Sequence, residues 1–139
     1  MVYQKLPGIK YLGYVQGKYL QRQMMQKSLA GIPVGIMTDT KEIEFAGQPT
    51  CEATSDYDNG GRIEKTTLKF VTGERIDLSQ DTAFVVTDVE NRSYVIGTRE
   101  KPHPIVRVSR FSGESQGAPA AFSYEVTLYA HRSLIPCSI

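Results

Sequence analysis

Residues 82–108 read TAFVVTDVENRSYVIGTREKPHPIVRV and contain the clearest strand pattern in the chain. Two short runs of β-branched and aromatic residues, 83–86 and 94–96, are separated by the polar residues Glu90, Asn91 and Arg92. Runs of this length and composition are typical of strands, and polar residues between them are typical of a turn. The sequence therefore predicts a β-hairpin at the centre of a sheet.

Two prolines, Pro102 and Pro104, interrupt the pattern after this hairpin. Proline has no backbone N–H to donate to a ladder of hydrogen bonds, so residues 101–104 are expected to leave the sheet. A third apolar run, 105–108, then begins a new strand.

Further strand patterns lie on both sides of this stretch. Period-two alternation or short apolar runs at close spacing are typical of all-β domains. We expect a first strand at 9–15 after a Pro7-Gly8 turn, and an edge strand or strand start at 32–37. A strand at 42–46, ended by Gly47, and a weaker strand at 50–54 should follow. Two longer strands are expected at 62–71, with two partly covered faces, and at 122–130, with alternate residues inward. The chain is predicted to be mainly β, a single domain over residues 1–139 forming a β-sandwich or small barrel with at most one short helix.

Residues 19–30 fit either a short helix or an extended segment. Good helix formers dominate the stretch, and Gly31 stands where a helix commonly ends in a left-handed glycine. The apolar stripe covers only one turn, which leaves the extended alternative open. Met24 and Met25 are candidates for contact with a neighbouring subunit.

The composition limits the function classes. The chain has 139 residues with 16 Lys and Arg against 15 Asp and Glu, so its net charge of +1 gives no overall field that would attract nucleic acid or an anionic membrane. No apolar run approaches the roughly 18 residues of a membrane span, and no signal segment is expected. Cys51 and Cys137 lack the number and spacing of a disulfide framework or zinc site, so two buried or half-buried thiols are expected.

Residues that could carry chemistry are scattered. His103 and His131 each lack a second ligand at metal-binding spacing, and a structural role is expected for both. Asp56, Asp58 and Asn59 resemble the start of a calcium loop, but Thr67 stands where the last acidic ligand belongs. No catalytic residue, metal or cofactor is predicted, and the local basic segment of Arg99, Lys101, Arg107 and Arg110 is interrupted by acids, so specific nucleic-acid binding is not expected.

Two polar loops and the apolar end of the chain are candidate interaction segments. Asn59-Gly60 predicts either a two-residue hairpin turn or a longer mobile loop over 55–62, and residues 111–121 form a second long polar loop. Residues 134–139 are mostly apolar and are expected to dock on the chain's own core or on a partner. The candidate interaction residues are Gly113, Gln116, Gly117, Asp58, Asn59, Met24, Met25 and Ile139.

The run AFVVTDVENRSYVIGTREKP at 83–102, followed by FSYEV at 122–126, resembles small virion proteins encoded by phages and prophages of Bacteroides-like bacteria. The resemblance covers about the C-terminal half of the chain. It implies a tail or head-tail junction subunit in the virion, which joins copies of itself edge to edge into a ring or tube and contacts other virion proteins through loops and termini. It implies no catalytic residue.

Two other functions remain open from the residues. A ligand-binding β-barrel would use Tyr14, Tyr94 and Tyr124 to line its cavity. A small hydrolase would need a cleft that joins His103 or His131 to an acid.

Overall fold

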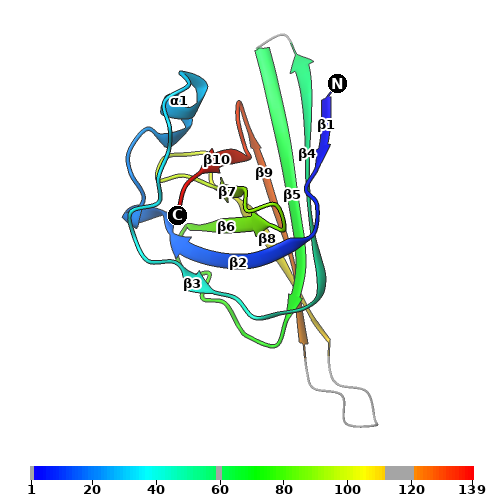
Figure 1. Ribbon diagram of the computed structural model, residues 1–139. Helices are drawn as coiled ribbons and strands as arrows, with labels where there is room; N and C mark the ends of the chain where they lie inside the picture. The colour runs from blue at the N-terminus through cyan, green and yellow to red at the C-terminus, as the bar shows by residue number, and fades with distance from the viewer. Residues whose placement is uncertain (1, 59–60, 112–120) are drawn as a thin grey trace.

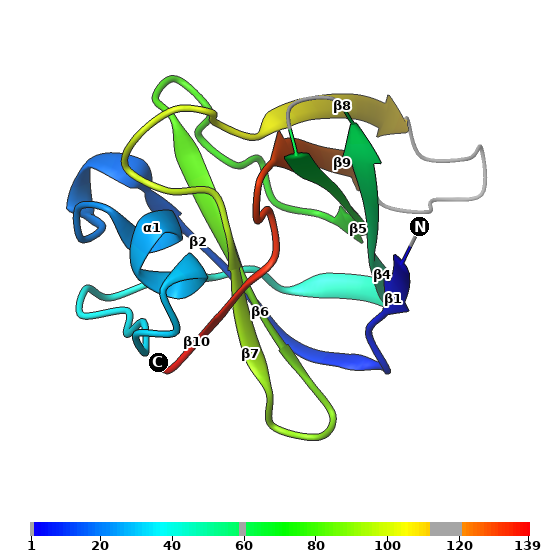
Figure 2. The same ribbon diagram turned by 90° about the horizontal axis from the view of Figure 1, so that it is seen from above.

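Two five-stranded antiparallel sheets packed face to face form the body of the computed structural model, which describes residues 2–58, 61–111 and 121–139 (Figure 1). Sheet A has the order β1-β4-β5-β9-β8, and sheet B has the order β10-β7-β6-β2-β3. A short helix, α1, covers part of the outer side of sheet B (Figure 2). The predicted β-sandwich is confirmed. The described strands form two open sheets and no closed barrel, so the barrel alternative is wrong.

Sheet A consists of β1 (Val2–Lys5), β4 (Phe45–Asp58), β5 (Gly61–Thr72), β9 (Ala121–Ala130) and β8 (Ile105–Phe111). Sheet B consists of β10 (Ile135–Cys137), β7 (Ser93–Ile96), β6 (Thr82–Asp88), β2 (Ile9–Gln16) and β3 (Lys41–Glu42). A 3-10 turn, Gly17–Tyr19, and α1, Met24–Leu29, follow β2.

The predicted hairpin is confirmed as β6 and β7, with Phe84 opposite Ile96 and Val86 opposite Tyr94. Strand β6 is the middle strand of sheet B, and all seven of its residues are buried. Its two faces belong to different apolar clusters. Phe84 and Val86 face sheet A, whereas Val85 packs with Met24 and other residues of the α1 layer. Burial on both faces explains why this strand reads as a continuous apolar run.

The bend between β6 and β7 is held by one buried carboxylate. Asp88 Oδ1 accepts the backbone N–H of Glu90 at 2.9 Å and of Arg92 at 3.0 Å. Asn91 has a φ of 66°, in the left-handed region that asparagine tolerates better than most residues. The turn predicted from the polar residues between the two runs is therefore confirmed.

Gly97 lies where β7 ends and should be intolerant of a side chain. Its φ is +108°, and a Cβ atom there would lie 2.9 Å from Pro104 Cγ and 3.2 Å from Ala83 Cα. We expect Gly97→Ala to lower the free energy of unfolding by about 2–3 kcal/mol, because it combines backbone strain with a clash against main chain. Chemical denaturation would measure this. Gly73→Ala is the matched control, since nothing lies within 4 Å of its added Cβ, and equal losses in the two variants would contradict the prediction.

The long strands of sheet A correct two expectations. Asp58 pairs with Gly61, so β4 and β5 form a hairpin joined by residues 59–60, which lie outside the described residues. The described parts of 55–62 are strand, so a loop over that range is wrong. Strand β5 has one covered face and not two, with alternate residues buried from Glu64 to Thr72. A buried glutamate at the start of that face obscured the alternation.

The strand assignments also differ from the expectation in four places. Residues 32–37 form no strand, and Gly35 makes only an isolated parallel bridge to Ser138. The predicted strand 42–46 is divided between β3 and β4, although Ile43 is buried and Glu42 and Glu44 are exposed as expected. Gly47, with φ +69°, lies in the irregular stretch of β4 and does not end the strand. The short edge strand β1 was not predicted.

The helix alternative for 19–30 is confirmed over α1. Gly31, at φ +78°, ends it as predicted: its N–H donates to Ser28 O at 3.1 Å, and the N–H of Ile32 donates to Lys27 O at 2.9 Å. The apolar C-terminal segment docks on the chain's own core, where Leu134 and Ile135 are buried.

Candidate functional site

The residues predicted for interaction do not form one surface. Gly113, Gln116, Gly117 and Asn59 lie outside the described residues, and Asp58 is the last residue of β4. Met24 is fully buried in the α1 layer, so its prediction as a partner contact is wrong: its side chain fills the space over sheet B. Met25 is half-buried against the same cluster, and Ile139 is 61% exposed.

Strand β8 is the longest open edge of the two sheets. It pairs with β9 on one side, and no backbone hydrogen bond between described residues reaches its other side. Ile105 and Val108 are 62% and 46% exposed on this strand. The other edges are shorter: β1 has four residues, β3 two, and β10 three with Pro136 among them. Short edges, proline and charged side chains all oppose pairing with another chain; β8 has seven residues and no proline within the strand, and Arg107 is a charged residue on it.

A hollow of about 910 Å³ lies beside this edge, between β8 and β9 and the connection from β5 to β6. Its apolar lining comes from Ile76, Leu78, Val108, Phe122 and Tyr124, and its polar lining from Arg75, Asp77 and Ser79. The Tyr124 hydroxyl fixes one wall, because it accepts the Ile76 N–H at 3.0 Å and donates to Glu74 O at 3.3 Å.

The three tyrosines predicted to line a cavity lie in different places. Tyr124 lines the hollow beside β8, whereas Tyr14 lines a separate hollow together with Asp39 and Asp77. Tyr94 is buried in the core between the sheets. The three tyrosines therefore do not share a pocket.

The two histidines have different surroundings. His103 Nε2 lies 3.4 Å from Asp81 Oδ2, and its Nδ1 is buried without a hydrogen-bond partner among the described atoms. His131 Nδ1 lies 3.0 Å from the carbonyl oxygen of Arg62. Within residues 2–58, 61–111 and 121–139, no three His, Cys, Asp or Glu side chains converge where they could hold a metal ion.

The predicted basic segment is spread over the molecule. Arg99 and Lys101 lie in the connection between β7 and β8, whereas Arg107 lies in β8 opposite Glu125 of β9. No helix among the described residues has both the length and the apolar character needed to cross a membrane.

Both cysteines are free, and burial raises the pKa of each thiol to about 12. At pH 8 we expect slow reaction of either thiol with a disulfide reagent in the folded protein, and rapid reaction of both in denaturant, because the thiolate is the reactive form.

As pH rises above about 9, unfolded thiols release protons that the folded chain retains, so the free energy of unfolding should fall. In the double variant Cys51→Val, Cys137→Val, the free energy of unfolding, measured by denaturation at each pH, should fall less steeply above about pH 9. An unchanged slope would show that the two thiols do not cause the fall.

Comparison of the chain with protein-family models, with curated proteins and with solved structures found no match. The candidate site is therefore defined by the geometry of this chain: the open edge of β8 and the hollow beside it. The apolar run at 105–108 predicted strand β8 but not its place at an edge, because local periodicity does not indicate the order of strands in a sheet.

Proposed function

We propose that this protein is a non-enzymatic structural subunit that assembles with copies of itself, as a component of a phage tail or head-tail connector ring. The observation that carries the proposal is the open edge of β8, with Ile105 and Val108 exposed on it. An unpaired edge of this length exposes backbone donors and acceptors that a second chain can pair with.

The direction of the strands is compatible with a ring. All neighbours in sheet A are antiparallel and the sheet has five strands, so its two edges, β1 and β8, run in the same direction. Copies related by rotation about an axis along the strands could pair β8 of one subunit in parallel with β1 of the next, a contact limited to the four residues of β1. Such a head-to-tail contact closes into a ring when the rotation divides a full turn.

The test is the absolute mass of the purified protein by light scattering over a concentration series, with negative-stain images of the same fractions. We expect a ring or another defined oligomer of about three or more subunits. Ile105→Lys should reduce the assembled fraction at least tenfold, because a lysine on an edge strand opposes pairing with another chain. A wild-type protein that stays monomeric at the highest concentration would contradict the proposal.

Val89→Lys is the matched control for this experiment. Val89 is 57% exposed, close to the exposure of Ile105, but it lies in the bend after β6 of sheet B and not on β8. It should assemble as the wild type does. Equal loss of assembly in both variants would indicate a general effect of added charge and would exclude β8 as the contact.

A second candidate function, binding of a small apolar ligand, is supported by the hollow lined by Ile76, Leu78 and Tyr124. Pockets of this volume with an apolar lining and a few polar groups are typical ligand sites. Ile76→Asp should then abolish binding of an apolar fluorescent probe while Val89→Asp retains it. Absence of probe binding to the wild type would remove this candidate.

A further inference from the structure

Charge is distributed unevenly along the chain. Residues 1–38 contain five Lys and Arg and no Asp or Glu, whereas residues 39–139 contain eleven Lys and Arg against fifteen Asp and Glu. The net charge of +1 therefore hides an N-terminal part of charge +5 and a remainder of charge −4. Such a separation matters if the fold keeps the two signs on different surfaces.

The fold gathers cations around α1. Arg22 precedes the helix and Lys27 lies in its last turn. Arg132 reaches the helix from the C-terminal segment, since its Nη1 donates to Ser28 O at 3.1 Å. The connection containing Arg99 and Lys101 is tied to the start of α1, because the Gln23 N–H donates to Glu100 Oε1 at 2.6 Å. We call Arg22, Lys27, Arg99, Lys101 and Arg132 the basic surface.

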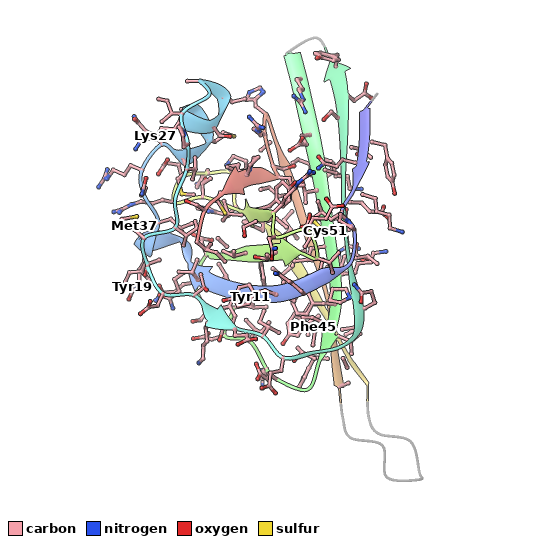
Figure 3. All side chains as sticks on the ribbon, in the orientation of Figure 1. Tyr11, Tyr19, Lys27, Met37, Phe45 and Cys51 are labelled. Carbon is pink, nitrogen blue, oxygen red and sulfur yellow. The ribbon has the colours of Figure 1, made fainter. Side chains whose placement is uncertain are left out.

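Glu100 and Asp81 are acids beside this surface. Glu100 is half-buried and accepts the Gln23 N–H, so it is turned toward the protein, whereas the exposed Asp81 lines a hollow together with Lys18 and Arg99. Exposed apolar side chains lie on the same α1 layer: Leu29 is 52%, Ile32 52% and Met37 85% exposed. Figure 3 shows Lys27 and Met37 on the side of the molecule away from sheet A. A cationic surface with exposed apolar side chains is suited to an acidic protein partner.

An acidic surface lies around β3 and the connection from β5 to β6. Thr72 joins its two segments, because the Thr72 hydroxyl donates to Glu44 O at 2.6 Å and accepts the Glu74 N–H at 3.2 Å. Asp39 and Asp77 line one hollow together with Lys41. We call Asp39, Glu42, Glu44, Glu74 and Asp77 the acidic surface; all five residues are exposed, with Lys41 and Arg75 as the cations among them.

The α1 part of the basic surface and the acidic surface lie toward different ends of the molecule, whereas Arg99 lines a hollow together with Gln80 and Asp81 at the end of the connection from β5 to β6. Figure 1 places α1 toward the upper end, and β3 with the connection from β5 to β6 toward the lower end. We infer that the partner of the basic surface is a second copy of this chain, which docks through its acidic surface. The inference rests on the proposed self-assembly and adds a second, electrostatic contact to the edge of β8. Because the two surfaces differ, the contact is head-to-tail and stacks copies in one direction.

Charge reversal gives a direct test. The first variant, Arg22→Glu with Lys27→Glu, makes the basic surface acidic; the second, Glu42→Lys with Glu44→Lys, makes the acidic surface basic. Each alone places like charges at the contact and should reduce stacked assemblies in negative stain and light scattering at least tenfold. An equimolar mixture should restore them, because each variant then meets opposite charge on the other. All four positions are exposed or half-buried, so each variant is expected to fold, and circular dichroism would check this.

The outcomes separate this inference from the proposed function. Wild-type stacks should disperse as salt rises from 50 mM to 500 mM, since a contact between exposed charges is screened. If single variants stack normally, or if the mixture does not restore stacking, the electrostatic contact is wrong. If rings persist in these variants and are lost only in Ile105→Lys, the proposed function stands without it. A wild type that remains monomeric contradicts both.

Discussion

Replacing Glu64 by alanine is expected to lower the free energy of unfolding by about 3–5 kcal/mol, because it removes a buried, fully engaged carboxylate. Glu64 Oε1 accepts the backbone N–H groups of Ser133 and Leu134, each at 2.8 Å, and the Ser133 hydroxyl at 3.2 Å. Its Oε2 lies 3.2 Å from Arg62 Nη2 and accepts the Ser55 hydroxyl at 3.3 Å. The variant would leave two buried N–H groups without their acceptor.

The position of Glu64 explains why the loss should be large. Ser133 and Leu134 lead directly into β10, so the carboxylate of β5 in sheet A fixes the segment that adds an edge strand to sheet B. Ser133 is fully buried, and its hydroxyl lies 2.6 Å from Thr66 Oγ1. Water cannot easily replace the lost acceptor at such a site.

Two further variants sharpen this test. Glu64→Gln keeps the shape and one carbonyl acceptor, so it should lose only about 1–2 kcal/mol. Glu90→Ala removes an exposed glutamate that lies 3.7 Å from Arg92, and it should change the free energy of unfolding by less than about 1 kcal/mol. Equal values for Glu64→Ala and Glu90→Ala in urea denaturation would show that the buried carboxylate does not hold the C-terminal segment.

Phe84→Ala should lower the free energy of unfolding by about 3–5 kcal/mol, because it leaves a cavity in the centre of the main core. Phe84 is fully buried in β6, and its ring centroid lies 6.1 Å from that of Phe70 in β5. The side chain therefore joins the middle strand of sheet B to sheet A. Thermal unfolding followed by circular dichroism would measure the change.

Two control variants test whether the loss depends on the volume removed and on burial of the site. Phe84→Leu removes less volume and should lose about half as much as Phe84→Ala. Val89→Ala, five residues along the chain at a 57% exposed position, should change the free energy by less than about 0.5 kcal/mol. A loss in Phe84→Ala as small as that of Val89→Ala would mean that β6 is not the centre of the core.

Local residue patterns were enough to predict most of the long strands and the pairing of the central hairpin. The β6–β7 hairpin follows from two apolar runs around a polar turn, and the proline-bounded exit before β8 follows from the missing backbone donors of Pro102 and Pro104. The inward face of β9 follows from alternation, since Tyr124, Val126 and Leu128 are all buried. These features depend on neighbours within about ten residues.

Contacts between distant residues decided the rest. Glu64 points inward because the backbone N–H groups of Ser133 and Leu134, about seventy residues away, donate hydrogen bonds that offset the cost of burying its carboxylate. Met24 is core because α1 covers sheet B, which also gives β6 two buried faces. Nothing in the neighbouring residues shows whether a glutamate such as Glu64 or a methionine such as Met24 is buried or exposed.

Residue patterns alone predict a mainly β chain, its central hairpin and the left-handed glycine that ends α1. Contacts between distant residues are needed to establish that the strands divide into two open sheets, that β8 is an edge with Ile105 exposed, and that cations around α1 lie apart from the acids around β3. The physical reason is that periodicity reports which face of a strand is buried. The order of strands, and hence the surfaces left for a partner, depends on pairings between residues far apart in the chain.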